Sequence, residues 1–279
     1  MESEWQAWPS SPVLVMQARI AEAIEAAAWA DSFAAAAGSD LGAETARIGD
    51  ATVMRMATLP AAFFSRVVGL STERPATAAT IADILAWYRD AGFTDIWFQP
   101  SPAAEPGGLL DLLAGCGIRP VARQWGKFVR GTDAPPEAQT DLEIREVGAD
   151  ASGDFATSVV EGFELPAFLH PWAAALPGRA GWRCYVAYDG TAPAACGALC
   201  CGGGGGFIGF DATRPAFRRR GAQGALLARR IADAGAAGVH TLTCETGVDA
   251  GGPGPSWRNI TKAGFKLLYV RPNCSPEAT

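Results

Sequence analysis

The stretch RPAFRRRGAQGALLARRI, residues 214–231, places three consecutive arginines directly before a glycine and an apolar helical pattern. The strand-like segment FIGFDAT precedes it at residues 207–213, so the order is strand, glycine-containing turn and helix. A turn of this kind points several backbone N–H groups at one spot, and the helix N-terminus adds about half a positive charge there. Gly221 and Gly224 carry no Cβ that would keep a ligand away from the backbone. The stretch therefore predicts a cradle for a pyrophosphate-type anion.

The three arginines at the helix start favour a bound anion. The helix dipole disfavours cations at an N-terminus, and the first turn after Arg218, Arg219 and Arg220 contains no Asp or Glu. A bound anion explains this charge better than a solvated helix start does. The stretch has neither the Lys-Ser/Thr ending of a nucleoside triphosphate loop nor the glycine spacing of a dinucleotide-binding turn.

The chain as a whole is acidic, which limits the partners of this local basic site. It has 279 residues, a formal net charge of −6 and a sequence pI of about 5.0. A general polyanion binder is therefore not expected, and no nucleic-acid partner is predicted. Apolar residues make up 49% and charged residues 19% of the chain, which is typical of a compact globular protein.

The cysteines and histidines indicate neither a metal site nor a disulfide framework. Seven cysteines occur without a C-x-x-C pair, and the two histidines, His170 and His240, lie far apart in sequence. Buried thiols in a reducing cytoplasm are the expected state. The N-terminal segment MESEWQAWPS has no basic flank before an apolar run, and no stretch of about 18 apolar residues occurs, so neither a secretory signal nor a membrane span is predicted.

Hydrophobic periodicity predicts helices and strands in alternation. The segment TAATIADILAWYRDAGF, residues 77–93, has apolar residues at i, i+3, i+4 and i+7, with Thr77 as the N-cap and Gly92 as the stop. Further helices are expected at residues 13–37, 109–114, 151–163, 167–176, 222–235 and 256–263. Strands are expected at residues 51–58, 63–70, 94–102, 121–129, 142–147, 182–190, 192–201, 207–213, 239–246 and 265–271. The polar segment 131–141 with its two prolines indicates a linker, and the glycine run 202–206 a hairpin tip.

Two parts of the chain share one order of elements. Each runs helix, strand, loop, short helix and strand, from DAG…TDIWFQPSP to WGKFVR in one part and from DAG…VHTLTCET to LLYVR in the other. We interpret this as a duplicated unit; a coincidence between two α/β segments is the alternative. Domains are accordingly expected at residues 1–136 and 140–279.

The segment around the arginines resembles motif A of the GNAT superfamily of acetyl-CoA-dependent N-acyltransferases. That motif is Arg/Gln-x-x-Gly-x-Gly/Ala between a strand and a helix. Arg218 matches its first position and Gly221 its fourth, whereas Gln223 stands at the sixth position, where a small residue is usual. Gly224 follows one place later, so the backbone can still hold phosphate if the Gln223 side chain points away.

The segment SWRNITKAGF, residues 256–265, resembles motif B of the same superfamily. A short helix leads there to Gly-Phe and a final strand, and Ser256 and Asn259 are the polar residues available for the coenzyme. The family often has a tyrosine, the general acid for the leaving thiolate, at the position that Ile260 holds here. The usual acid is therefore missing.

The resemblance covers about residues 140–279 and implies an α/β (α+β) fold with a mixed, mostly antiparallel sheet flanked by helices. It implies acetyl-CoA as co-substrate, with the pyrophosphate on residues 219–224 and the thioester beside the strand end 211–213. Direct attack by an amine on the thioester would transfer the acetyl group. The residues expected to contact acetyl-CoA are Asp211, Ala212, Thr213, Arg218, Arg219, Arg220, Gly221, Ala222, Gln223, Gly224, Ser256 and Asn259.

The catalytic base is not evident from the sequence. Asp211 and Glu245 lie on expected strands near the site and could relay a proton through water, but each could equally be a surface carboxylate. His170 could face the acceptor or be structural. The apolar residues expected to line an acceptor cleft, or to be core, are Phe163, Phe168 and Trp172.

Two classes of function remain open on this basis. One is an acetyltransferase acting on a small-molecule amine; transfer of a longer acyl group is a variant of it. The other is a CoA-binding sensor or interaction module without turnover, which the missing tyrosine motivates. The identity of the acceptor and the oligomeric state stay open.

The N-terminal part resembles a degenerate copy of the same fold. Its loop STERPATAAT has no glycine after the arginine, and Pro75 has no N–H to offer a phosphate. We therefore expect one coenzyme site per chain, in the C-terminal part.

Overall fold

The computed structural model describes residues 11–104, 108–249 and 251–277. The expected N-terminal feature MESEWQAWPS lies outside the described residues. The helices are α1 (Pro12–Ala35), α2 (Ala78–Arg89), α3 (Leu109–Gly115), α4 (Ser152–Gly162), α5 (His170–Ala174), α6 (Ala222–Ala236) and α7 (Pro255–Lys262). The strands are β1 (Ala43–Ile48), β2 (Ala51–Met56), β3 (Arg66–Val68), β4 (Trp97–Gln99), β5 (Ile118–Gly131), β6 (Glu143–Val147), β7 (Trp182–Asp189), β8 (Ala192–Gly202), β9 (Gly205–Thr213), β10 (Thr241–Asp249), β11 (Gly252–Pro253) and β12 (Lys266–Pro276).

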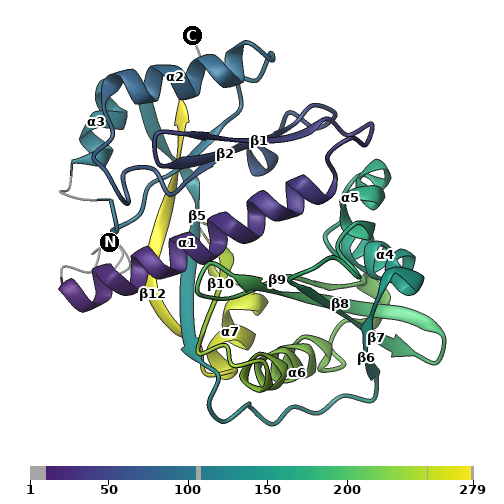
Figure 1. Ribbon diagram of the computed structural model, residues 1–279. Helices are drawn as coiled ribbons and strands as arrows, with labels where there is room; N and C mark the ends of the chain where they lie inside the picture. The colour runs from purple at the N-terminus through teal and green to yellow at the C-terminus, as the bar shows by residue number, and fades with distance from the viewer. Residues whose placement is uncertain (1–10, 105–107, 250, 278–279) are drawn as a thin grey trace. The chain divides into compact units, whose positions relative to one another are not determined.

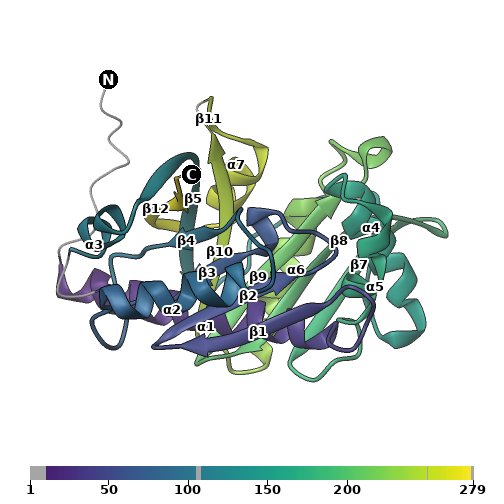
Figure 2. The same cartoon turned by 90° about the horizontal axis from the view of Figure 1, so that it is seen from above.

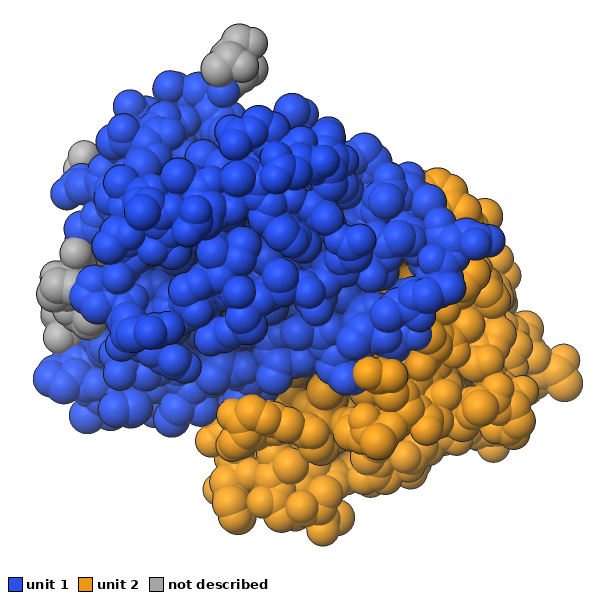
Figure 3. All heavy atoms as spheres, turned by 45° about the horizontal axis from the view of Figure 1, so that its top comes forward, with its two compact units in different colours: residues 1–127, 245–254, 267–279 blue, residues 128–244, 255–266 orange. Residues whose placement is uncertain are grey.

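The chain forms two compact units, coloured separately in Figure 3. Unit 1 contains residues 1–127, 245–254 and 267–279, and unit 2 contains residues 128–244 and 255–266. Strands β5, β10 and β12 are thus divided between the units. The expected domains 1–136 and 140–279 stay a prediction, because a division by compactness does not test where a duplicated sequence begins.

Unit 1 holds a mixed, mostly antiparallel set of strands in the order β1-β2-β3-β4-β12-β5. Strands β1–β2 and β2–β3 are antiparallel, β3–β4 is parallel and β4–β12 is antiparallel. Helices α2 and α3 lie on one side of these strands and α1 on the other (Figure 1). The β1–β2 hairpin and the neighbouring α2 are in the foreground of Figure 2. Ile81, Ile84 and Tyr88 on the apolar face of α2 are fully buried.

Unit 2 has the same pattern in the order β10-β9-β8-β7-β6. Its strands β6–β9 are antiparallel to one another, and β9 is parallel to β10. Helices α4 and α6 cover opposite faces: Phe210 packs against Phe155 of α4, whereas the adjacent Asp211 pairs with Arg230 of α6. The expected order of elements is confirmed, because α2, β4, α3 and β5 follow one another as α6, β10, α7 and β12 do, with the short β11 added before α7; the duplication itself stays a prediction.

Most of the expected element boundaries hold, and their local causes are visible. Thr77 caps α2 as predicted: its hydroxyl accepts the N–H of Thr80 at 3.2 Å in a capping box. Gly92 follows that helix with a φ of 80°. The strand expected at residues 63–70 is shorter, because residues 62–64 form a 3-10 turn before β3.

Two helices differ in detail from their expectation. The expected helix 167–176 is a 3-10 turn over residues 167–169 followed by the short α5. Gly235 lies inside α6 and does not end it, and Gly238, with a φ of 73°, follows the helix. The N–H of Gly238 bonds to the carbonyl of Gly235 at 3.0 Å, so the helix closes on a tight turn.

A buried ion cluster holds α1 in unit 1. The guanidinium of Arg271 lies 2.8 Å from Glu25, 2.8 Å from Glu245 and 3.1 Å from Glu22, and Arg66 lies 3.0 Å from Glu245. Burial lowers the pKa of Arg66, although Glu245 opposes that shift. Lys127 completes the cluster through an ion pair with Glu25. The members, which we call the ion cluster, are Glu22, Glu25, Arg66, Lys127, Glu245 and Arg271.

All seven cysteines are thiols, five buried and two half-buried. Of the helices in the described ranges, none is long and apolar enough to cross a membrane.

Candidate functional site

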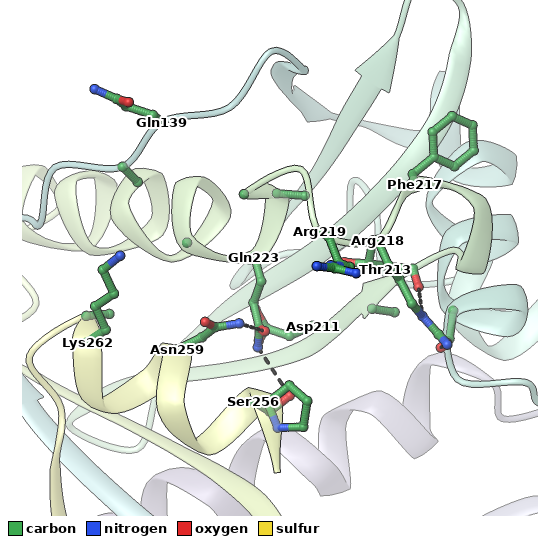
Figure 4. Close-up of a pocket in the computed structure, with 18 of the residues that line it drawn as sticks. Gln139, Asp211, Thr213, Phe217, Arg218, Arg219, Gln223, Ser256, Asn259 and Lys262 are labelled. Atoms are coloured by element: carbon green, nitrogen blue, oxygen red, sulfur yellow. Dashed lines mark hydrogen bonds between the residues drawn. The ribbon is translucent and has the colours of Figure 1, made fainter.

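The predicted cradle opens onto a pocket of unit 2 with a volume of about 900 Å³ (Figure 4). Its walls are the end of β9, the loop that leads into α6, the first turn of α6, helix α7 and residues 136–139 of the preceding loop. Helix α6 directs its N-terminus, with the associated partial positive charge, at this space.

The structure gathers at this pocket all but one of the residues expected to contact acetyl-CoA. The residues that line the pocket are Asp211, Ala212, Thr213, Arg218, Arg219, Gly221, Ala222, Gln223, Gly224, Ser256 and Asn259. Ser256 and Asn259 are more than 30 positions beyond Gln223 in sequence, so the meeting of the two motifs is a result of the tertiary fold.

Arg220 is the exception, and it lies outside the pocket lining. Its guanidinium lies 2.8 Å from Asp189, and its Nε donates to Asp141 at 3.1 Å. These hydrogen bonds from Arg220 lower the pKa of both carboxyls. The absence of acidic residues near the arginines in sequence was therefore a poor guide to their partners.

Gly221 has a structural reason to be glycine. Its φ is 78°, and a Cβ there would lie 2.1 Å from the carbonyl oxygen of Gln139. Gly224 differs, because a Cβ at that position would lie 3.8 Å from the Cβ of Ala138, an ordinary contact distance. Gly221 therefore shapes the loop, while Gly224 keeps the wall of the pocket open.

The end of β9 contains a β-bulge beside the pocket. The register between β8 and β9 shifts between Cys196 and Ala198, so that Phe210 and Asp211 together oppose one residue of β8. Phe210 has a φ of 57°, an unfavourable conformation for a large side chain. Its ring packs against Trp172 and Trp182 at centroid distances of 5.2 and 5.6 Å, which offsets that strain.

Arg230 fixes the bulge from the side of α6. Its side chain is fully buried and donates to the carbonyls of Ala198 at 3.0 Å and Gly209 at 3.2 Å. It also forms an ion pair with Asp211. One side chain thus ties helix α6 to β8 and to both sides of the bulge in β9.

A chain of polar side chains joins α6 to α7 across the pocket (Figure 4). The amide of Asn259 donates to Gln223 at 2.7 Å, and the amide of Gln223 donates to Ser256 at 3.4 Å. The Gln223 side chain therefore points toward α7 and into the space between the helices, and not away from the pocket as the motif would require.

Two cations line the pocket without a carboxylate partner in the described part of the chain. They are Arg219, which has a φ of 70°, and Lys262 of α7. Arg218 also lines the pocket, but it lies 3.2 Å from Glu164. Lys262 was not predicted from the sequence, although its position three residues after Asn259 places both on one face of a helix.

The candidate bases separate into two groups. Asp211 lines the pocket, with both carboxylate oxygens accepting from Arg230. Glu245 belongs to the ion cluster of unit 1 and lies outside the pocket lining; burial, together with the charge of Glu25, raises its pKa. Ile260, at the position of the usual tyrosine, is buried, with only 5% of its surface exposed.

The expected acceptor wall is only partly present. Phe163 lines the pocket and is 49% exposed, and Phe217, which was not predicted, lines it as well. Trp172 is buried core against Phe210. His170, at the start of α5, and the exposed Phe168 lie outside the lining. No group of three or more His, Cys, Asp or Glu side chains suited to a metal ion occurs in the described ranges.

Comparison with solved structures defines the fold class: the chain has the fold of the GCN5-related N-acetyltransferases (GNAT). A GCN5-related N-acetyltransferase from Kribbella flavida matches 92% of this chain and 96% of its own at a TM-score of 0.62 and 15% identity. One from Sphaerobacter thermophilus covers 96% of each chain at a TM-score of 0.57 and 17% identity. A tandem GNAT protein from the clavulanic acid biosynthesis pathway covers 98% of each chain at a TM-score of 0.59 and 14% identity. No protein-family model and no curated protein sequence matches the chain.

Proposed function

We propose that this chain is an acyltransferase that binds acetyl-CoA in the pocket of unit 2 and transfers the acetyl group to a small-molecule amine. The observation that carries the proposal is the pocket at the N-terminus of α6, with Arg219 and Lys262 facing it unpaired among the described residues. A helix N-terminus with adjacent free cations attracts phosphate oxygens. The GNAT fold makes a CoA thioester the candidate ligand.

The residues present fit the chemistry of the coenzyme. Backbone N–H groups of residues 221–224 would hold the pyrophosphate, and Arg219 and Lys262 would neutralise the phosphate charges. The volume of about 900 Å³ lies within the range of small-molecule sites. The bridge from Gln223 to Asn259 crosses this space and would have to open for the coenzyme to enter.

The transfer step follows from the position of the bulge. Backbone N–H groups at residues 211–213 would polarise the thioester carbonyl. The lone pair of a neutral amine would attack the carbonyl carbon and the C–S bond would break. The nitrogen would release one proton to water, and water would return a proton to the leaving thiolate, so the products are an amide and free CoA. Arg230, which ties down both sides of the bulge, would position these N–H groups.

A CoA-binding sensor without turnover is the second candidate. The burial of the apolar Ile260 favours it, because the position of the usual proton donor carries no titratable group. The ion pairing of Asp211 with Arg230 points the same way, since both carboxylate oxygens of Asp211 already accept hydrogen bonds from Arg230. For both candidate functions we propose a cytoplasmic location, because the seven free cysteines fit a reducing compartment.

The test is calorimetry with acetyl-CoA on the full chain, followed by a screen of amine acceptors that records CoA release. Arg219→Met and Lys262→Met should each weaken acetyl-CoA binding about tenfold, as expected for the loss of one charged phosphate contact. Lys266→Met is the matched control, because Lys266 lies outside the pocket lining on the same unit. Absence of acetyl-CoA binding at millimolar concentration would refute both candidates, and binding without CoA release across the panel would favour the sensor.

A further inference from the structure

In unit 1, the carboxylate of Asp50 is surrounded by backbone N–H groups. Asp50 ends the turn between β1 and β2 and is 4% exposed. Its Oδ1 accepts the N–H of Ser71 at 2.9 Å, and its Oδ2 accepts those of Glu73 at 2.8 Å and Arg74 at 3.2 Å. Three donors from one short loop that converge on one carboxylate form the kind of concave site that also binds phosphate oxygens.

The place of this loop in the fold matches that of the pocket loop in unit 2. Residues 69–77 join β3 to α2, and residues 214–221 join β9 to α6. In each unit the strand before the loop pairs in parallel with the strand that follows the helix. The loop around Asp50 is therefore the counterpart in unit 1 of the candidate coenzyme cradle.

We propose that Asp50 is a built-in anion that occupies an oxyanion site of unit 1 and closes it to phosphate-type ligands. A buried carboxylate needs several hydrogen-bond donors, and the loop supplies them from its backbone alone. The site is thus formed and filled by the same chain. Unit 1 would then carry no coenzyme because the Asp50 side chain occupies the site. This reason adds to the two given by the sequence, Pro75 and the missing glycine.

Unit 2 has a carboxylate at the matching hairpin turn, and it is held differently. Asp189 is the last residue of β7, before the β7–β8 turn, whereas Asp50 is the last residue of the β1–β2 turn, so the two carboxylates lie on different sides of their turns. The guanidinium of Arg220 lies 2.8 Å from Asp189, so this carboxylate is neutralised by a side chain. In unit 2 the carboxylate of Asp189 is thus bound by the side chain of Arg220. In unit 1 the carboxylate of Asp50 is bound by backbone N–H groups of the loop 69–77.

The shape of the Asp50 site does not depend on Asp50 alone. The hydroxyl of Ser71 accepts the N–H of Ala76 at 3.2 Å, and the hydroxyl of Thr72 donates to the carbonyl of Gly69 at 2.8 Å. These bonds support the loop conformation, including the φ of 64° at Ser71. Removal of the carboxylate should accordingly leave the N–H groups in place and without acceptors.

The test is chemical rescue of the full-length Asp50→Ala variant. Rescue is measured by thermal unfolding in formate, inorganic phosphate or chloride at equal ionic strength. The variant should melt about 3–6 °C below the wild type in chloride, since buried donors lose their acceptor. Formate and phosphate should recover at least half of that loss, with a gain that rises with the logarithm of anion concentration. Rescue by both anions supports the proposal, whereas rescue by formate alone would show a site too small for phosphate and would overturn it.

Three controls make the outcome decisive. The wild type and Asp83→Ala, which removes an exposed carboxylate of α2, measure the general stabilising effect of each salt, and the gain of Asp50→Ala over chloride should exceed theirs in formate and in phosphate. Asp50→Asn should be destabilised but not rescued, because its amide fills the site and faces the N–H groups with an N–H₂. If Asp50→Ala unfolds in chloride, refolding is scored in the three salts instead. Equal behaviour in all three salts overturns the proposal, and none of these measurements involves acetyl-CoA, so the outcome is independent of the proposed function.

Discussion

The guanidinium of Arg230 lies directly over the backbone of Gly197. A Cβ at Gly197 would be 2.6 Å from Cζ of Arg230 and 2.8 Å from its Nη1, closer than real Cβ contacts allow. The glycine in β8 and the arginine in α6 are therefore one structural feature. The pair leaves the guanidinium in hydrogen-bonding range of both strands at the bulge.

Gly197→Ala should consequently destabilise the protein by about 3 kcal/mol, since the buried guanidinium must shift and lose partners. Gly202→Ala is the matched control on the same strand, because no atom lies within 4 Å of the position that its Cβ would take. Urea unfolding of both variants measures the difference. A Gly197→Ala variant as stable as the control would show that Arg230 can move at no cost.

Gly224 offers a direct probe of charge in the pocket. Because the position accepts a side chain, Gly224→Glu and Gly224→Gln should both fold, and the two differ only in charge. The glutamate should weaken acetyl-CoA binding at least tenfold more than the glutamine, through repulsion of phosphate. Calorimetry at two salt concentrations checks this, and equal affinities would place the phosphates elsewhere. Gly221 is less suitable, because its substitution clashes with Gln139.

Gln223 should restrict access to the pocket. Gln223→Ala removes the bridge to Asn259 and Ser256, and it restores the small residue that is usual at this position of the motif. We expect acetyl-CoA to bind about three- to tenfold more tightly, since no bridge must be broken. Stopped-flow association rates and calorimetry test this. Weaker binding would mean that the Gln223 amide contacts the coenzyme.

The ion cluster should give a specific pH dependence. Burial alone would raise the pKa of Glu25, but Arg271 and Lys127 hold it well below its ordinary value. The stabilisation by this carboxylate is therefore complete above about pH 4.5, the range of an unfolded glutamate, and falls as the pH drops toward the folded value.

Glu25→Gln should accordingly cost about 3 kcal/mol at pH 7, with a smaller cost below about pH 4. Burial and the charge of Glu25 raise the pKa of Glu245, so the contribution of Glu245 has the opposite dependence. Urea unfolding at pH 7, 5, 4 and 3 measures the difference between variant and wild type. If the difference in unfolding free energy between Glu25→Gln and wild type stays constant over this pH range, the lowered pKa of Glu25 is contradicted.

Separation at the 131–141 segment should leave the C-terminal piece unable to fold. Residues 245–254 and 267–279 are part of unit 1, and in a 137–279 fragment Arg271 would lose Glu22 and Glu25. We expect aggregation, visible by size-exclusion chromatography and light scattering. Co-expression with residues 1–136 should restore soluble protein, and a monomeric, folded fragment on its own would disprove the expectation.

Local sequence determined most of the elements, although not the strand β1, and the order of strand, turn and helix at the pocket. The capping box at Thr77, the strand, turn and helix order around Gly221 and the repeated order of elements all depend on residues within a few positions of one another. Such signals survive in a single sequence because a helix or turn is stabilised by its own neighbours. Together with the resemblance to the GNAT superfamily, which implied the fold class, they indicated about half of the residues that line the pocket.

Tertiary structure alone decided which charges are free and which are paired. Arg220 meets Asp189 and Asp141, 31 and 79 positions away, and Glu245 is buried in the ion cluster although the sequence placed it near the site. For the same reason Lys262 lines the pocket, and Asp50 accepts backbone N–H groups from residues 71–74, more than 20 positions away. The electrostatic energy of a charge depends on its distance from other charges and on its burial, and both are set by contacts between segments that are remote in the chain.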